Sequence, residues 1–134
     1  MSLKKMLEQN SQLTIKSLQK FQREYDARFV DEGFTGFDKV RHTYAHLGKL
    51  FGRLAEYVQK VEDGDPKFSP EEIKQKVIPD LLVYAAWLSH EFGVDMEEAY
   101  LKRIVENIKR VHGDKISPQE LAELENYVNA RLKE

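Results

Sequence analysis

The sequence predicts an all-α fold, an antiparallel bundle of about five helices that is completed by dimerisation. Apolar residues recur at steps of three and four, Ser-Pro-x-Glu helix starts stand at residues 69–72 and 117–120, and no segment reads convincingly as a strand. A chain of 134 residues fits one domain, 1–134, and a helical protomer of this size can bury a further face against a second copy.

Two amphipathic helices are predicted in the first half of the chain. The first extends from Leu3 to Phe29 and ends at the turn at residues 33–36, where two glycines permit backbone angles that other residues avoid. The second begins near Asp38, which can cap it, and ends at Val61. The stripe predicted to face the core consists of Val40, Tyr44, Leu47, Leu50 or Phe51, Leu54 and Val58.

A polar stripe lies beside the apolar stripe of this second helix. Its members follow one another at steps of four and three, so neighbouring side chains can touch. They are His42, His46, Lys49, Arg53, Glu56 and Lys60. Gly48 and Gly52 each cost the helix about 1 kcal/mol against alanine, which suggests that something packs or binds there.

Residues 77–88 are apolar on every side of a helix except at Asp80, and we expect them to form the central buried helix. This third helix begins at residues 69–72, bends at Pro79 and ends at Phe92-Gly93. An unpaired buried charge is costly, so the carboxylate needs a cation, a metal ion or hydrogen-bond donors. Asp80 is therefore either a structural carboxylate held by a neighbouring helix or part of a functional site.

The fourth helix, which Asp95 caps, carries a polar face of residues at steps of four and three. These residues are Arg103, Asn107 and Arg110. Two guanidinium groups on one face can hold a phosphate group with forked donors. The alternative is a solvated face whose charge is balanced by Glu106. A fifth helix follows from Ser117.

Composition excludes several classes of function. The formal net charge is −2 with both signs interspersed, so the chain lacks the basic field of a non-specific nucleic-acid-binding protein. It has no cysteine, which excludes disulfides, thiolate zinc sites and a cysteine nucleophile. The N-terminus lacks the apolar core of a signal peptide, and the longest apolar run is too short to cross a bilayer. We expect a cytoplasmic protein with no nucleic-acid or membrane partner.

Three strings follow one another between Leu47 and Arg110. They are Gly52-Arg53-Leu54-Ala55-Glu56, Asp80-Leu81-Leu82-Val83-Tyr84 and Phe92-Gly93-Val94-Asp95-Met96-Glu97-Glu98-Ala99. With the polar face of the fourth helix, where Arg103 replaces a lysine, they resemble the motifs of MazG-like proteins in the all-α nucleoside triphosphate pyrophosphohydrolase superfamily. The resemblance covers about half the chain. It implies a homodimer or a dimer of dimers, in which the polar face contacts the phosphates of a nucleotide.

The family holds magnesium with Glu-Glu-x-x-Glu in one helix and Glu-x-x-Asp in the next. In this sequence Lys49, Leu50 and Arg53 occupy the three acidic positions of the first motif. Val77 replaces the glutamate of the second motif, which leaves Asp80 as the one matching acid. Magnesium needs several oxygen ligands, so Mg²⁺ is expected only if a rearranged site is catalytically active. The exchange of acids for bases favours an anion instead.

Two hypotheses follow from the resemblance. The first, which we prefer, is a scaffold that has lost the magnesium-dependent pyrophosphohydrolase site and binds a nucleotide or another phosphate-bearing anion. Its anion contacts are His46, Lys49, Arg53, Arg103, Asn107 and Arg110, with Asp80 as an internal counter-ion. The second is an active pyrophosphohydrolase in which Asp80, as catalytic residue and metal ligand, is joined by an acid such as Glu56 or Asp95.

A third hypothesis concerns His42 and His46. Imidazoles four residues apart on a helix can share a transition-metal ion, and a third ligand would come from Asp80, His90 or a symmetry mate. The alternative is a pair of polar histidines at a helix interface in a purely structural, dimeric helical protein. The positive charge nearby on the same stripe opposes a dication.

Overall fold

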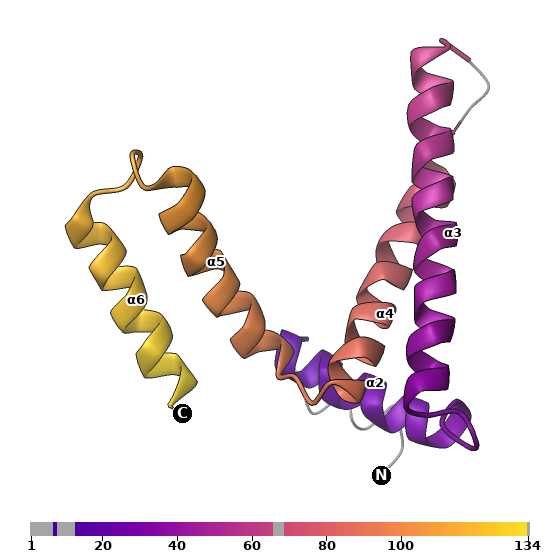
Figure 1. The fold of residues 1–134 in the computed structure, drawn as a ribbon, viewed down its shortest axis with the longest axis horizontal. Helices are drawn as coiled ribbons and strands as arrows, with labels where there is room; N and C mark the ends of the chain where they lie inside the picture. The colour runs from indigo at the N-terminus through magenta and orange to yellow at the C-terminus, as the bar shows by residue number, and fades with distance from the viewer. Residues whose placement is uncertain (1–6, 8–12, 66–68, 134) are drawn as a thin grey trace. The chain divides into compact units, whose positions relative to one another are not determined.

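The computed structural model describes Leu7, residues 13–65 and residues 69–133. The elements are α2 (Ile15–Phe29), α3 (Phe37–Glu62), the π-helical segment η1 (Ile73–Val77), α4 (Ile78–Glu91), α5 (Met96–His112) and α6 (Pro118–Leu132). The described part of the chain contains no strand, and the predicted all-α fold is confirmed there (Figure 1).

Two compact units divide the chain, Met1–Val94 and Asp95–Glu134. In the first unit α4 packs against both α2 and α3, and α3 and α4 run antiparallel (Figure 1). In the second unit α5 and α6 form an antiparallel hairpin. The expectation of one domain stays a prediction.

Side-chain caps fix where most of the helices begin. The Thr14 hydroxyl accepts the backbone N–H of Ser17 at 3.1 Å and the Ser17 hydroxyl accepts that of Thr14 at 2.8 Å, so α2 begins at Ile15. The single long helix predicted at the start of the chain is therefore interrupted before this residue. Residues 1–6 and 8–12 of that prediction lie outside the described residues.

The predicted caps of α5 and α6 and the turn before α3 are confirmed. Asp95 accepts the backbone N–H of Glu98 at 3.0 Å, and Ser117 accepts that of Glu120 at 3.1 Å. Gly36 precedes α3 with a φ of 65°, in the left-handed region that favours glycine, and it replaces the predicted aspartate as the N-cap.

Pro79 explains the widened turn ahead of α4. Proline has no backbone N–H, and its ring collides with the carbonyl four residues earlier, so regular helical bonding cannot pass through it. The chain forms η1 instead, where the N–H of Ile78 donates to the carbonyl of Ile73. The predicted bend thus takes the form of one π-helical turn.

The packed face of α3 differs from the prediction. Lys39, Thr43 and Leu50 are its buried residues. Tyr44 and Phe51 of the predicted core stripe are 79% and 63% exposed. The apolar stripe lies roughly 100° around the helix from the packed face. Leu50 of the predicted stripe is buried, but Lys39 and Thr43 on the neighbouring polar side are buried with it, and the charge of Lys39 finds partners there.

The α4 helix is buried on fewer sides than its composition predicts. Val77 and Ala86 are buried, but Ile78 and Leu82 are 59% and 47% exposed. Asp80 is half-buried rather than enclosed. The expectation of a central buried helix is wrong for the described residues, because α2 and α3 cover only part of the circumference of α4 and leave an apolar side open.

Candidate functional site

Three residues of the predicted polar stripe gather on the side of α3 next to α4. They are His46, Lys49 and Arg53, and we term them the basic face. His46 and Arg53 are half-buried, whereas Lys49 is exposed. Steps of three and four residues bring the side chains together because they complete one helical turn. The structure therefore places these three predicted anion contacts side by side.

Asp80 and Tyr84 of α4 lie near the basic face. The ring centroids of Tyr84 and His46 are 5.4 Å apart. Burial raises the pKa of Tyr84, the charge of Asp80 raises it further, and the guanidinium of Arg53 lowers it. The phenol therefore keeps its proton and remains a hydrogen-bond donor at neutral pH.

His46 favours its neutral form. Burial lowers its pKa, and the charges of His42 and Lys49 lower it further, while Asp80 raises it. Asp80 thus lies near His46 of α3, although it is not fully enclosed. A neutral imidazole still offers one N–H donor to a ligand.

Arg53, a member of the basic face, also pairs with Glu72. Its Nε lies 3.4 Å from a Glu72 carboxylate oxygen, and the two side chains are 40% and 51% exposed. An exposed pair of this kind contributes about 0–1 kcal/mol. A phosphate group, which accepts two parallel bonds from a guanidinium, can therefore compete with Glu72 for Arg53.

Aromatic rings adjoin the basic face. The centroids of His42 and His46 are 4.2 Å apart. Trp87 stands edge-on to Tyr84 at 5.4 Å, and its ring lies 6.0 Å from that of His42. We term His42, His46, Tyr84 and Trp87 the aromatic cluster. The aromatic cluster provides rings beside the basic face, on which a flat group of a ligand can stack.

The side chains do not fit a magnesium or transition-metal site. Within the described ranges, no three His, Asp or Glu residues gather so that they could hold a metal ion. The absence applies to an acid that would join Asp80 in holding magnesium. It applies equally to a third ligand that would join His42 and His46 in holding a transition metal. Lys49 and Arg53 also carry positive charge, which repels a divalent cation. The chemistry inferred for this site therefore involves no metal ion.

Arg103, Asn107 and Arg110 lie on α5, in the second unit. Arg103 donates to Glu106 at 2.9 Å, and both side chains are largely exposed, as in the alternative of a solvated face. Asn107 is half-buried, and its Oδ1 has no hydrogen-bond partner in the described part of the chain. The role of these three residues as phosphate contacts stays a prediction.

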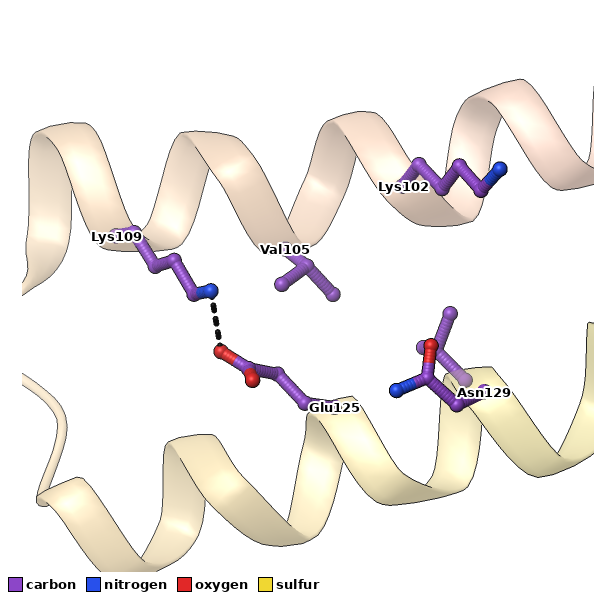
Figure 2. Close-up of a pocket in the computed structure, with 6 residues that line it drawn as sticks. Lys102, Val105, Lys109, Glu125 and Asn129 are labelled. Carbon is purple, nitrogen blue, oxygen red and sulfur yellow. Dashed lines mark ion pairs between the residues drawn. The ribbon is translucent and has the colours of Figure 1, made fainter.

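A pocket of about 170 Å³ lies between α5 and α6 (Figure 2). Val105 and Val128 supply its apolar lining, and the ion pair of Lys109 with Glu125, 2.6 Å apart, spans the two helices. Lys102 and Asn129 complete the lining. No predicted site residue lines this pocket.

Sequence reasoning missed a buried lysine at the start of α3. Lys39 is fully buried, and its Nζ lies 2.6 Å from Asp31 and 3.6 Å from Asp26. A third carboxylate, Glu91 at the end of α4, lies 4.0 Å away. Lysine is almost never fully buried unless it is paired. We term Lys39 and these three acids the lysine network.

Hydrogen bonds extend the lysine network. Asp26 Oδ1 accepts the indole N–H of Trp87 at 3.0 Å and the amide of Gln22 at 2.8 Å. Glu91 accepts the backbone N–H of Gly36 at 2.9 Å, while its other oxygen has no hydrogen-bond partner among the described residues. The network therefore joins α2, the loop before α3, α3 itself and α4.

Two signals in the sequence could have revealed this network. Lys39, Thr43 and Leu50 recur at steps of four and seven, so they share one stripe of a helix. Trp87, in the most apolar segment of the chain, needs an acceptor for its indole N–H once it is buried. Neither signal identifies Asp26 as that acceptor, because residues 61 apart in sequence meet only in the folded chain.

Comparisons with family models, with curated protein sequences and with solved structures give no match for this chain. Of the helices in the described ranges, none combines the length and the apolar character needed to cross a membrane. The interpretation of the site therefore depends on its geometry and on the motifs of the sequence.

Proposed function

We propose that the protein is a MazG-like homodimer that has lost the magnesium-dependent pyrophosphohydrolase site and binds a nucleotide or another phosphate-bearing anion at the basic face. The motifs of the sequence supply the family and the class of ligand. The basic side chains that replace the family's acids indicate that this ligand is negatively charged. A cytoplasmic location belongs to the same proposal.

One observation carries the proposal: the polar side of α3 faces α4. His46 and Arg53 are held half-buried, where charge is screened less than in bulk water. Arg53 stands against Glu72, and Asp80 lies near His46, so acids already accompany the basic face before a ligand binds. An anion that displaces the half-exposed Glu72 leaves the site with donors from both helices.

The donors near the basic face suit phosphate oxygens. Arg53 offers a fork of N–H groups and Lys49 offers an ammonium group. His46 and Tyr84 offer a neutral N–H and a protonated hydroxyl. Such a set recognises negative charge and does not activate water, which supports binding without hydrolysis.

Isothermal titration without metal tests the proposal, with a nucleotide panel and inorganic triphosphate as probes. We expect binding heat, and we expect Arg53→Ala to weaken binding by about tenfold, because a charged hydrogen bond is lost. Arg41→Ala is the matched control, since Arg41 belongs to the same helix but pairs with Asp38. An absence of heat with every probe would remove the proposal.

A pyrophosphate-release assay separates binding from hydrolysis. With a mixture of nucleoside triphosphates and Mg²⁺ or Mn²⁺, we expect no release, because among the described residues no acids gather with Asp80 to hold the metal. Release that disappears in the Asp80→Ala variant would instead establish an active pyrophosphohydrolase.

The proposal includes residues of the second unit only because of the resemblance to MazG-like proteins. Arg103 and Arg110 are candidate phosphate contacts, with Asn107 between them on α5. In the same titration we expect Arg110→Ala to weaken nucleotide binding. Unchanged affinity would limit the ligand contacts to the basic face.

The open apolar sides of α3 and α4 support the homodimer. Tyr44, Phe51 and Val58 are exposed on α3, and Ile78 and Leu82 are exposed on α4. Each set recurs at whole-turn steps, so it forms an exposed apolar stripe on its own helix. Exposed apolar stripes of this kind are typical of a protein interface, and two such helix pairs can close a four-helix bundle.

The mass of the protein in solution tests the dimer. We expect the parent chain to sediment as a dimer or a larger even assembly and Phe51→Glu to sediment as a monomer. Val111→Glu is the control, because Val111 is also about half exposed but lies on α5. A monomeric parent, or a Phe51→Glu variant that keeps the parent mass, would contradict this arrangement.

A further inference from the structure

The lysine network holds the single tryptophan of the chain in place. Asp26, which is 2% exposed, accepts the indole N–H of Trp87 at 3.0 Å. Lys39 Nζ lies 5.0 Å from the centre of the Trp87 ring, within cation–π distance. One contact fixes the edge of the ring and the other its face, so the orientation of Trp87 is set from two directions.

Trp87 links the lysine network to the basic face. Its ring lies 5.4 Å from Tyr84, whose ring lies 5.4 Å from His46 of the basic face. On the other side it lies 6.0 Å from His42, which stacks on His46 at 4.2 Å. A change in the angle of Trp87 therefore moves the aromatic surface beside the proposed phosphate contacts.

We infer that Asp26 and Lys39 are positioning residues that hold the aromatic cluster, through Trp87, as a stacking surface for the flat aromatic group of a phosphate-bearing ligand. The inference rests on the proposed function and narrows its ligand class. A nucleotide is preferred over an inorganic phosphate chain of similar charge. Asp26 and Lys39 are both buried, so they act on this ligand through Trp87 without touching it.

Stacking explains why such a preference arises. A base stacked on an aromatic side chain strengthens binding by about tenfold or more, and every base has a π-face, so the gain does not require a particular base. Inorganic triphosphate offers the same phosphate oxygens without this gain. The ratio of the two dissociation constants therefore isolates the aromatic part of the site.

The experiment compares ATP with inorganic triphosphate, both without metal, on the full chain and three variants. Asp26→Leu removes the charge and the acceptor for Trp87. Asp26→Asn removes the charge but keeps an oxygen that can accept the indole N–H. Gln22→Leu is the matched control, because Gln22 donates to the same carboxylate without contacting Trp87. Fluorescence of Trp87 reports its surroundings in each variant, since the chain has no other tryptophan.

We expect the parent to bind ATP about tenfold more tightly than inorganic triphosphate. Asp26→Leu should lose most of this preference through weaker ATP binding alone, with a shifted Trp87 emission maximum. Asp26→Asn should restore both the preference and the emission, and Gln22→Leu should change neither. Equal loss of both ligands in Asp26→Leu, or an Asp26→Asn variant that behaves like Asp26→Leu, overturns the inference.

Two further outcomes separate this inference from the proposed function. A parent that binds neither probe removes the proposed function and this inference with it. A parent that binds both probes equally leaves the anion site in place and overturns the inference alone. If Asp26→Leu does not fold, Trp87→Phe carries the test, because it keeps a ring but removes the indole donor. We then expect a partial loss of the ATP preference, and an unchanged preference overturns the inference.

Discussion

Two charge clusters on α3 differ in how their charges are matched. Lys39 is closed off from water, with three carboxylates around one ammonium group. Lys49 and Arg53 are partly open, with Asp80 nearby and the half-exposed Glu72 alongside. The cation of the closed cluster is not accessible to a ligand, so its role is to hold elements together. The open cluster can exchange a weak partner for a ligand.

The largest effect, on stability, is expected from a substitution that disrupts the closed cluster. Lys39→Met leaves the buried Asp26 and the partly buried Asp31 and Glu91 without their cation, and we expect the free energy of unfolding to fall by about 3–5 kcal/mol. Urea denaturation measures it. Lys102→Met is the control, because Lys102 is exposed and its pair with Glu98 contributes little. A loss as small as that of the control would show that the lysine network does not stabilise the fold.

A smaller effect, on the affinity for anions, is expected from a substitution at the open cluster. Asp80→Asn removes the acid near the basic face, so we expect anions to bind up to about fivefold more tightly, in line with one weakly screened charge pair. Titration with inorganic triphosphate measures this change. Asp114→Asn, in the turn between α5 and α6, is the control. Weaker binding in Asp80→Asn would mean that the carboxylate assists the ligand.

The smallest expected effect is the pH dependence that His46 imparts. Burial, His42 and Lys49 lower its pKa below the ordinary 6.5 in the folded chain. As the pH falls from 6.5 towards this lowered pKa, the unfolded chain takes up a proton that the folded chain does not, so the free energy of unfolding decreases. Above pH 6.5 this contribution is constant.

Urea denaturation at pH 7.5 and 5.5 checks this sign. We expect His46→Gln to lose less stability on acidification than the parent does, while His112→Gln, at the end of α5, behaves like the parent. An equal loss in His46→Gln and the parent would show that the imidazole does not contribute.

Local features of the fold could be predicted from the sequence, and the choice of packed faces could not. Caps at Asp95 and Ser117 and the effect of Pro79 depend on neighbouring residues, so their patterns sufficed. The packed face of α3 depends on what α4 and α2 offer, and there the carboxylates of Asp31 and Asp26 lie beside the buried Lys39. Periodicity finds an apolar side but does not say whether the same chain covers it.

The candidate site was predictable to a similar degree. Steps of three and four brought His46, Lys49 and Arg53 together as expected. Asp80 lies near His46, yet its enclosure was overestimated, because the openness of α4 was not visible in its composition. Glu72 as a partner of Arg53 was not foreseen, since the pairing depends on the course of the chain through η1.

That π-helical turn acts as a one-residue insertion in an otherwise regular helix. It sets the angular position of everything upstream, because one residue turns a helix by roughly 100° about its axis. Glu72 lies just before this turn and Pro79 just after it, so the turn that Pro79 imposes sets where Glu72 meets Arg53. The local winding of the helix thus tunes how readily an anion gains access to the guanidinium group.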